Sequence, residues 1–421
     1  MFGTDALSMA DILDRSRQAA RIWRDRPLGL RLQVIARVRR LIAAEAISLA
    51  DSLGQRRPAA DTLTAEVLPL AEAARFLERQ AAHLLAPRRP GRRGRPAWLA
   101  GVSVEIRREP CGVVLILAPA NYPLFLPAVQ ILQALAAGNA ICAKPAMGCA
   151  APLTSFADML RRSGLPDGVL MILDEDISTG EAASRAGFDK IVLTGAAATG
   201  VAVLQSAADR LTPCTMELSG DDPVFVLPGA DLSLVAAAVA YGTRLNDGQT
   251  CIAPRRIFAP VEMAQALERL LAASCPAPPP VIPVRDAEDA LARAAASPYA
   301  LGAAIFGPDA QARDFAARVD AGCVVINDVI VPTADPRLPF GGRRRSGFGV
   351  TRGAEGLLEM TVIKSIAVRR GRFRPHLNPP ATQDGAFFAA MIAVLHGDRR
   401  TRLLALPALA SAARRIGWRR R

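Results

Sequence analysis

The longest uncharged run of the chain contains the segment from Val113 to Ala143, and the composition of this segment strongly limits the fold that the chain can adopt. A run of this length could cross a membrane, because a transmembrane helix needs about 20 apolar residues. Prolines, a glycine and asparagines interrupt it, however, at positions 119, 121, 123, 127, 138 and 139. Proline and glycine tend to end helices and strands. The run therefore predicts a buried strand, a loop, a helix and a second buried strand.

Strands and helices continue to alternate after this run. Apolar segments that favour strands lie at 113–118, 140–145, 169–173, 190–195 and 223–227, and the pattern begins again with segments at 256–258, 281–284, 300–306 and 323–327. Apolar strands separated by helices are typical of a parallel sheet that is covered on both faces. Residues 1 to about 86 show helical spacing of apolar residues, at Ile22, Leu30, Val34, Ile35, Val38 and Leu41. The sequence thus predicts an α/β fold with a helical N-terminal region.

The formal net charge of +13 could indicate nucleic-acid binding. The basic residues are almost all arginines spread over the whole chain, however, and lysine occurs only at positions 144, 190 and 364. Aromatic residues make up 5% of the chain, so few side chains are available for base stacking. We therefore expect no nucleic-acid partner.

The seven cysteines form no CxxC pair, and the three histidines lie far apart in the sequence. An odd number of cysteines without a secretory signal is typical of reduced thiols in the cytosol. The N-terminal segment lacks the basic start and the continuous apolar core of a signal peptide. We therefore expect a cytoplasmic protein with no metal site.

Three residues could carry chemistry. Cys251, in the string NDGQTC, is the candidate nucleophile, because a cysteine thiolate is strongly nucleophilic. Glu217, in MELSGDDPVFV, could activate water once the sulfur is acylated, and Asn121, in APANYPL, could donate to an oxyanion. Each also has a structural interpretation: a buried inert thiol, a carboxylate paired with an arginine, and an asparagine in a turn.

In this chain order the three residues resemble the active-site signatures of the aldehyde dehydrogenase superfamily. Six strings carry the resemblance, namely EPCGVVLILAPANYPL, ALAAGNAICAKPA, DKIVLTGAAATG, MELSGDDP, NDGQTC and NDVIVPTADPRLPFGGRRRSGFG. The last is most similar to the compact, dimeric branch of the superfamily. The resemblance implies that Cys251 adds to an aldehyde, that hydride passes to NAD or NADP, and that water activated by Glu217 hydrolyses the thioester. It also implies a homodimer.

The resemblance further implies cofactor-binding residues and a domain plan. Contacts to the dinucleotide are expected from Ala118, Pro119, Lys144, Pro145, Gly195, Gly200 and Phe340, with a structural role as an alternative for Phe340 and for Asn327. The plan has a Rossmann-type cofactor domain at 1–217, an α/β catalytic domain at 218–345, a return segment at 346–370 and a basic tail at 371–421. Residues 101–110 and the segment VIKSIAVRR would form a small β oligomerisation arm.

The chain departs from the family pattern at several places. Met147 replaces a glutamate that binds the adenine ribose, Ala196 replaces a serine, and LSGDD replaces a glycine pair and lysine. The segment between Cys251 and Val281 is several tens of residues shorter than in the family and lacks a second ribose-binding glutamate. The loss of both carboxylates favours NADP over NAD. An acyl-transferring enzyme and a non-catalytic family member remain as alternatives.

The substrate and the tail allow further expectations. The residues around Asn121 and Cys251 are mostly apolar, with Arg244 as the one nearby charge, so we expect apolar or medium-chain aldehydes. The tail segment AFFAAMIAVLH is too short to span a bilayer. The arginine-rich segment that follows could lie on an anionic membrane or, as we favour, pack on its own domain or across a dimer. Pro407 is expected to interrupt its helix.

Overall fold

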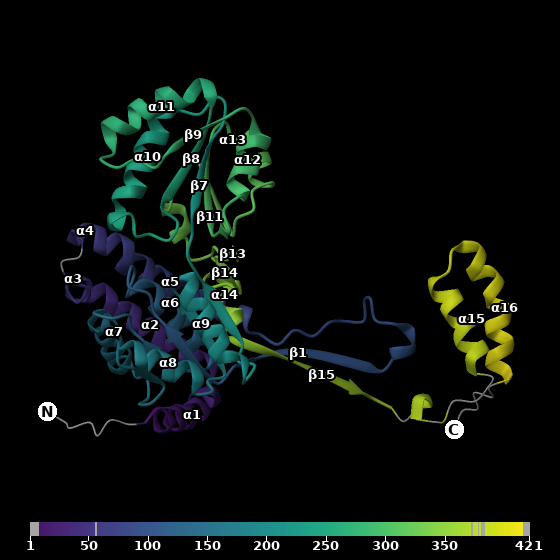
Figure 1. The fold of residues 1–421 in the computed structure, drawn as a ribbon. Helices are drawn as coiled ribbons and strands as arrows, with labels where there is room; N and C mark the ends of the chain where they lie inside the picture. Colours follow the sequence, from purple (N-terminus) through teal and green to yellow (C-terminus); the bar gives the residue numbers. More distant parts are fainter. Residues whose placement is uncertain (1–7, 55–56, 372–373, 378, 380–383, 416–421) are drawn as a thin grey trace. The chain divides into compact units, whose positions relative to one another are not determined.

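A computed structural model describes residues 8–54, 57–371, 374–377, 379 and 384–415 (Figure 1). The chain divides into two compact units. The larger comprises residues up to 89 and from 105 to 366, and the smaller comprises residues 90–104 and those from 367 onward. Part of the predicted linker near residue 378, and Trp418 in the tail, lie outside the described residues. The domain limits expected at residues 217 and 345 stay predictions.

The first sheet of the larger unit has six strands in the order β14-β6-β5-β2-β3-β4. Five of them are parallel, and the short β14 is antiparallel to β6. Their bounds are β2 Val113–Leu117, β3 Ala140–Lys144, β4 Leu170–Ile172, β5 Lys190–Thr194, β6 Cys214–Glu217 and β14 Gly347–Phe348. Every residue of β2 is buried, which explains why this strand is continuously apolar. The parallel sheet confirms the predicted α/β class.

Helices surround this sheet. They are α1 Met9–Asp25, α2 Leu28–Ala44, α3 Ala46–Asp51, α4 Ala59–Thr62, the π-helix η1 Leu63–Val67, α5 Leu68–Leu84, α6 Phe125–Ala137, α7 Ala150–Arg162, α8 Ile177–Arg185, α9 Ala197–Ala208 and α14 Gly353–Glu359. All residues of α6 are buried, so the uncharged run forms β2, a loop, α6 and β3, as predicted. In the N-terminal helices Val34, Ile35 and Val38 are buried, whereas Ile22 and Leu30 are exposed.

The second sheet of the larger unit has five parallel strands in the order β12-β11-β7-β8-β9. Helices α10 and α11 cover one face and α12 and α13 the other (Figure 1). The bounds are β7 Asp222–Val226, α10 Leu232–Arg244, β8 Pro254–Pro260, α11 Val261–Ser274, β9 Val281–Val284, α12 Ala287–Ala295, β11 Gly302–Phe306, α13 Asp309–Ala316 and β12 Cys323–Ile326. A small antiparallel pair, β10 Tyr299–Ala300 with β13 Arg343–Arg344, completes this part. The second α/β region is thus also as predicted.

The two strands that the resemblance assigns to an arm pair with each other. These strands, β1 Val102–Pro110 and β15 Thr361–Arg369, form a two-stranded sheet. Short 3-10 turns, η2 Ala97–Leu99 and η5 Pro375–Leu377, lie in the smaller unit. The role of the arm in oligomerisation stays a prediction.

The tail forms a hairpin of two contacting helices, α15 Asp384–His396 and α16 Arg399–Arg415. Pro407 lies inside α16, so the expected interruption is wrong. The carbonyl that loses its intrahelical partner belongs to Leu403, whose side chain is 69% exposed, and water can replace that bond. Among the described residues, no helix combines the length and the apolar character needed to cross a membrane.

Candidate active site

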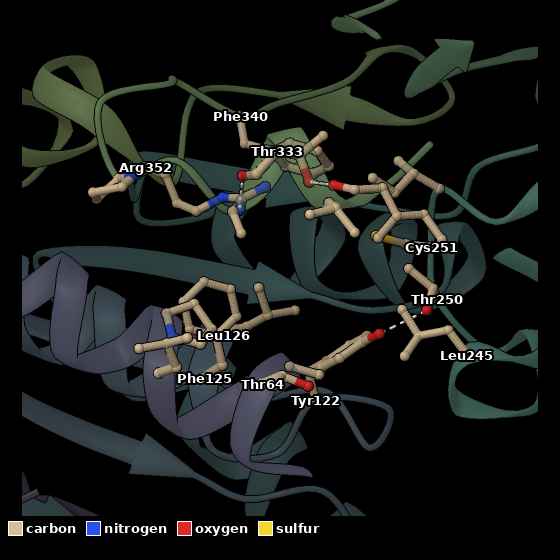
Figure 2. A pocket seen from close by; sticks show the side chains of 18 of the residues that line it. Thr64, Tyr122, Phe125, Leu126, Leu245, Thr250, Cys251, Thr333, Phe340 and Arg352 are labelled. Atoms are coloured by element: carbon tan, nitrogen blue, oxygen red, sulfur yellow. Dashed lines mark hydrogen bonds between the residues drawn. The ribbon is translucent and has the colours of Figure 1, made fainter. Parts of the chain in front are cut away.

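A cavity of about 370 Å³ lies in the larger unit, and its lining combines Glu217 of the first sheet with helix and loop residues from both α/β regions (Figure 2). Cys251 and Glu217 both belong to the lining, together with the buried Arg352. Most of the wall is apolar or aromatic, and includes Tyr122, Phe125, Leu126, Tyr241, Leu245 and Phe340. The structure therefore brings the predicted nucleophile and the predicted base to one cavity with apolar walls.

Cys251 follows a tight turn, η3 Leu245–Gly248. Asn246 and Asp247 have φ values of 54° and 50°, in the left-handed region that asparagine and aspartate tolerate better than most residues. The chain also needs Gly220 here, because a Cβ atom on it would lie 2.5 Å from the Cys251 carbonyl oxygen. The LSGDD string thus allows the strand after Glu217 to approach the cysteine closely.

The Cys251 thiol is held mainly in its protonated form. Burial raises its pKa, the negative charges of Glu217 and Asp222 raise it further, and Arg352 lowers it. A nucleophilic role therefore requires that the proton be removed as substrate binds, since the thiolate is the reactive form.

Glu217 is the last residue of β6 and is 2% exposed. Its Oε2 atom accepts a hydrogen bond from the Thr351 hydroxyl at 2.6 Å, while its buried Oε1 atom has no hydrogen-bond partner among the described residues. Burial raises the pKa of this carboxyl group, and the charge of Arg352 and the Thr351 bond oppose that effect. A carboxyl group with a raised pKa and a free oxygen is suited to accept a proton from water.

Arg352 is a site residue that the sequence did not reveal. It is 7% exposed, its Nη1 atom donates to the Thr333 carbonyl at 2.6 Å, and its guanidinium lies 4.2 Å from the centre of the Phe340 ring. No local sequence signal distinguishes Arg352, because the chain is rich in arginines throughout. Arg244, by contrast, is largely exposed and pairs with Asp61 at 3.5 Å.

Asn121 does not belong to the cavity lining. Its amide nitrogen donates to the carbonyl of Gln249 at 2.8 Å, and its Oδ1 atom accepts from the Tyr122 backbone at 2.9 Å. Residues 245–251 are called the cysteine loop here. Asn121 thus contacts this loop at Gln249, two residues before Cys251. Its role as an oxyanion donor stays a prediction.

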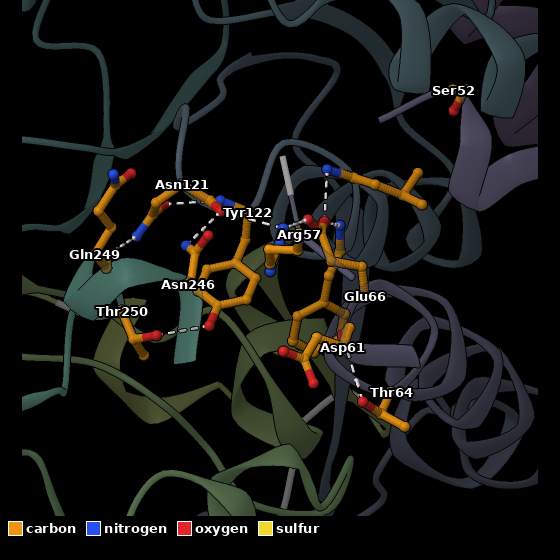
Figure 3. A network of polar contacts seen from close by, with 12 residues as sticks. Ser52, Arg57, Asp61, Thr64, Glu66, Asn121, Tyr122, Asn246, Gln249 and Thr250 are labelled. Carbon is orange, nitrogen blue, oxygen red and sulfur yellow. Dashed lines mark hydrogen bonds and ion pairs between the residues drawn. The ribbon is translucent and has the colours of Figure 1, made fainter. Parts of the chain in front are cut away.

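A buried ion pair fixes the turn that contains Asn121 (Figure 3). Arg57 and Glu66 pair with side-chain exposures of 4% and 0%. The Oε2 atom of Glu66 accepts from the backbone nitrogens of Leu124 and Phe125, at 3.0 and 2.9 Å. Glu66 lies in the π-helix η1, an irregularity that often marks functional sites. The sequence did not predict this pair.

Tyr122 connects this ion pair to the cysteine loop. The Arg57 guanidinium lies 4.9 Å from the centre of the Tyr122 ring, and the Tyr122 hydroxyl is 2.6 Å from that of Thr250, next to Cys251. Burial raises the pKa of Tyr122 to about 12, so its hydroxyl stays protonated near neutral pH. The asparagine turn and the cysteine loop are therefore joined by side-chain bonds.

Several of the predicted cofactor residues lie at the carboxyl ends of parallel strands. Lys144 ends β3, Ala118 follows β2 and donates its backbone N–H to the Lys144 carbonyl at 2.9 Å, and Gly195 follows β5. Gly200 packs so closely on Leu218 that an added Cβ would lie 2.7 Å from it. Nucleotides bind at this edge in open parallel sheets, so the arrangement fits a dinucleotide.

Other predicted contacts are placed differently. Phe340 is 2% exposed and stacks under Arg352 in the cavity wall. Asn327 exchanges hydrogen bonds with the backbone of Gly307, at 2.9 and 3.0 Å, and this is a structural role. Met147, which stands where the family has a glutamate that binds the adenine ribose, is exposed. The Lys144 amino group donates to the Glu175 carbonyl at 2.7 Å.

Comparison with known proteins is consistent with this geometry. The chain is 27% identical to the 4,4'-diapolycopene aldehyde oxidase of a Methylomonas species, over 92% of this chain and 87% of that protein. It is 28% identical to a Pseudomonas aeruginosa protein described as a probable coniferyl aldehyde dehydrogenase, over 80% and 86%. The crystal structure of Mycobacterium tuberculosis aldehyde dehydrogenase complexed with NAD+ has the same fold, with a TM-score of 0.80, 24% identity and coverage of 87% and 92%.

A family model matches most of the chain. The model described as "Aldehyde dehydrogenase family" matches residues 4–276 and 279–366. These ranges contain both sheets, the cavity and every predicted site residue. The match confirms the expectation from the sequence: the chain belongs to the aldehyde dehydrogenase family.

Proposed function

We propose that this protein oxidises an aldehyde to a carboxylic acid, with Cys251 as nucleophile and Glu217 as the base for deacylation. The observation that carries the proposal is that these two residues, from separate parts of the chain, line one cavity. As substrate binds, the Cys251 thiol gives its proton to the Glu217 carboxylate, which passes it on to solvent. The sulfur adds to the aldehyde carbon, and the carbonyl oxygen becomes an oxyanion. Bound NAD or NADP would accept the hydride from that carbon, and a thioester would remain on Cys251.

The chain's own residues complete the cycle. Glu217, whose Oε1 atom is free, accepts a proton from water, and the resulting hydroxide attacks the thioester. The C–S bond then breaks, the acid leaves, and the sulfur regains a proton. Lys144, Pro145, Gly195 and the backbone after β2 would hold the dinucleotide at the carboxyl edge of the first sheet. Presence of Glu217 in the cavity favours hydrolysis over transfer of the acyl group to another thiol.

The substrate class follows from the cavity wall. The wall is mostly aliphatic and aromatic, and the charge of Arg352 is balanced by that of Glu217. Two relatives are named for 4,4'-diapolycopene aldehyde and for coniferyl aldehyde. We therefore propose an apolar or aromatic aldehyde as substrate. An acidic aldehyde would lose hydration of its carboxylate without gaining an uncommitted cation.

The proposal is tested by following reduction of NAD and NADP, in parallel, with hexanal and with succinic semialdehyde. We expect kcat/KM to be at least about tenfold higher for hexanal, because about 0.8 kcal/mol is gained for each methylene that the apolar wall buries. Absence of reduction with either cofactor and either aldehyde would contradict the proposed activity. A preference for succinic semialdehyde would leave the activity in place and overturn the substrate class.

We also propose a homodimer in the cytoplasm, with the tail helices packed in the dimer. The seven cysteines are all free, as is typical of a reducing compartment. The hairpin exposes Phe388 and Ile392 on α15, and Leu403 and Leu404 on α16, more apolar surface than a solvated helix pair needs. A second copy of the chain is the occupant that we favour, and an anionic membrane is the alternative.

Ending the chain at Pro380 is expected to convert the dimer to a monomer, because the exposed apolar side chains of the hairpin are removed with it. Sedimentation equilibrium of both forms measures the change. A dimer that persists in the shortened form would contradict tail packing. Co-sedimentation with anionic vesicles by the full chain alone would instead favour the membrane.

A further inference from the structure

We propose that Arg352 is a positioning residue for deacylation: its guanidinium group is the counter-charge that keeps Glu217 ionised inside the cavity. This inference rests on the proposed roles of Cys251 and Glu217. The geometry supports it in two ways. Thr351 bonds the Glu217 carboxylate at 2.6 Å, and the next residue, Arg352, lines the same cavity as that carboxylate.

Glu217 needs such a counter-charge because its surroundings are dry. It is 2% exposed, and within the described part of the chain one of its carboxylate oxygens has no hydrogen-bond partner. Removing a carboxylate from water favours its neutral form, and a protonated carboxyl group cannot accept a proton from water. An opposite charge nearby restores the ionised form.

Arg352 is the group that can supply the counter-charge to Glu217, as the charged and titratable groups around the site indicate. The charge of Arg352 lowers the pKa of Glu217. The pKa of Cys251 is raised by Glu217 and Asp222 and lowered by Arg352. The pKa of Arg352 is in turn raised by Glu217, Cys251 and Cys323. Of these interacting groups, Arg352 is the one cation, so its removal would leave only groups that are neutral or negative.

Arg352 is held in place by groups that leave its charge intact. Its Nη1 atom donates to the neutral Thr333 carbonyl, and its guanidinium lies 4.2 Å from the Phe340 ring centre and 5.8 Å from that of Phe125. Its buried Nε atom has no hydrogen-bond partner in the part of the chain that the structure describes. Figure 2 shows Arg352 and Cys251 on the same side of the cavity, opposite Tyr122 and Phe125. The charge is thus fixed, desolvated and available to Glu217.

Hydrolysis of p-nitrophenyl acetate isolates the step at issue, because it needs no dinucleotide. The Cys251 thiolate attacks the ester carbonyl, p-nitrophenolate leaves, and an acetyl thioester forms. Water then attacks the thioester, Glu217 accepts the proton of that water, the C–S bond breaks, and acetate leaves. The first turnover appears as a burst of p-nitrophenolate, and the steady rate reports deacylation.

We expect Arg352→Met to keep the full burst amplitude, reached more slowly because Arg352 also lowers the pKa of Cys251. Its steady rate near pH 7 should fall about tenfold or more, since one unit of pKa is a factor of about ten in the ionised fraction of Glu217. Loss of the positive charge raises the pKa of Glu217, so the steady rate should recover at higher pH. The midpoint of its pH profile should rise by about one unit or more. Arg352→Lys, which keeps the charge, should have the midpoint of the unchanged protein.

Three control variants separate this inference from the proposed function. Arg26→Met removes an arginine that stacks on Trp23, 5.7 Å from the ring centre and outside the cavity, and should change nothing. Glu217→Gln should give a burst without a steady rate at any pH. A burst that survives Cys251→Ala would contradict the proposed nucleophile, whatever Arg352 does.

Several outcomes would overturn the role of Arg352. They are an unshifted midpoint in folded Arg352→Met, or a shift in Arg352→Lys as large as in Arg352→Met. Circular dichroism checks folding. If Arg352→Met does not fold, Arg352→Lys decides, because a midpoint displaced by about one unit despite the retained charge excludes an electrostatic role. A rise in KM for succinic semialdehyde alone would reassign Arg352 to substrate binding.

Discussion

Replacing Cys251 with alanine is expected to lower kcat/KM for hexanal oxidation by about 10⁴-fold or more, since loss of a catalytic nucleophile removes the covalent route altogether. The residue lines the cavity and is only partly buried, so a smaller side chain should leave the fold intact. Reduction of the dinucleotide measures the loss, and circular dichroism verifies the fold.

Cys323→Ala provides a matched control for this experiment. Cys323 begins β12, is also partly buried, and lies close enough to Arg352 to affect its pKa, but it does not line the main cavity. The Cys323→Ala variant should therefore retain most of the activity. Full activity in Cys251→Ala would remove the nucleophile from the mechanism, and loss of activity in both variants would point to a general effect of the cysteines on packing.

The fold could be read from the sequence because its signals are local. The run from Val113 to Ala143 combines continuous apolar character with prolines and a glycine at defined places, and β2, α6 and β3 form where these signals predict them. Pro407 is the exception. Its effect depends on whether water can reach the Leu403 carbonyl, and that exposure is a property of the folded tail.

The site could be predicted only in part. Cys251 and Glu217 stand in distinctive strings, and the structure brings both to one cavity. Arg352 carries no such signal, because its importance comes from burial beside Glu217, and burial depends on the return of the chain after the second sheet. The same holds for Arg57 and Glu66, whose pairing is set by the packing of the N-terminal helices against α6.

Asn121 illustrates a different limit of prediction from the sequence. Sequence identifies an amide near the site but not the group to which that amide donates. In the folded chain the amide bonds the Gln249 carbonyl, so it holds the cysteine loop against the turn before α6. Asn246 reinforces the connection by donating to the Asn121 carbonyl at 2.9 Å. The shape of the loop that carries Cys251 therefore depends on residues far from it in sequence.

Glu66→Gln is expected to cost about 3–5 kcal/mol in the free energy of unfolding, because it leaves Arg57 as a buried and unpaired charge. Among the described residues, the Nε and Nη1 atoms of Arg57 have no hydrogen-bond partner, and its guanidinium is compensated by Glu66, the Tyr122 ring and the Asn121 carbonyl. The glutamine oxygen can still accept from the backbone of Leu124 and Phe125, but its NH2 group then faces the Arg57 donor, so the variant loses both the charge and the hydrogen bond from Arg57. Urea unfolding measures the loss.

Arg57→Met serves as the complementary variant and should cost less than Glu66→Gln, since the Glu66 carboxylate keeps the two backbone N–H groups at the start of α6. Glu45→Gln, at the more exposed ion pair with Arg162, is the matched control. It should leave the free energy of unfolding nearly unchanged. An equal loss from Glu66→Gln and Glu45→Gln would contradict the special role of burial. If the pair also positions Tyr122 against Thr250, Glu66→Gln should lower kcat for hexanal in protein that is still folded, because the hydroxyl contact beside Cys251 is displaced with the turn.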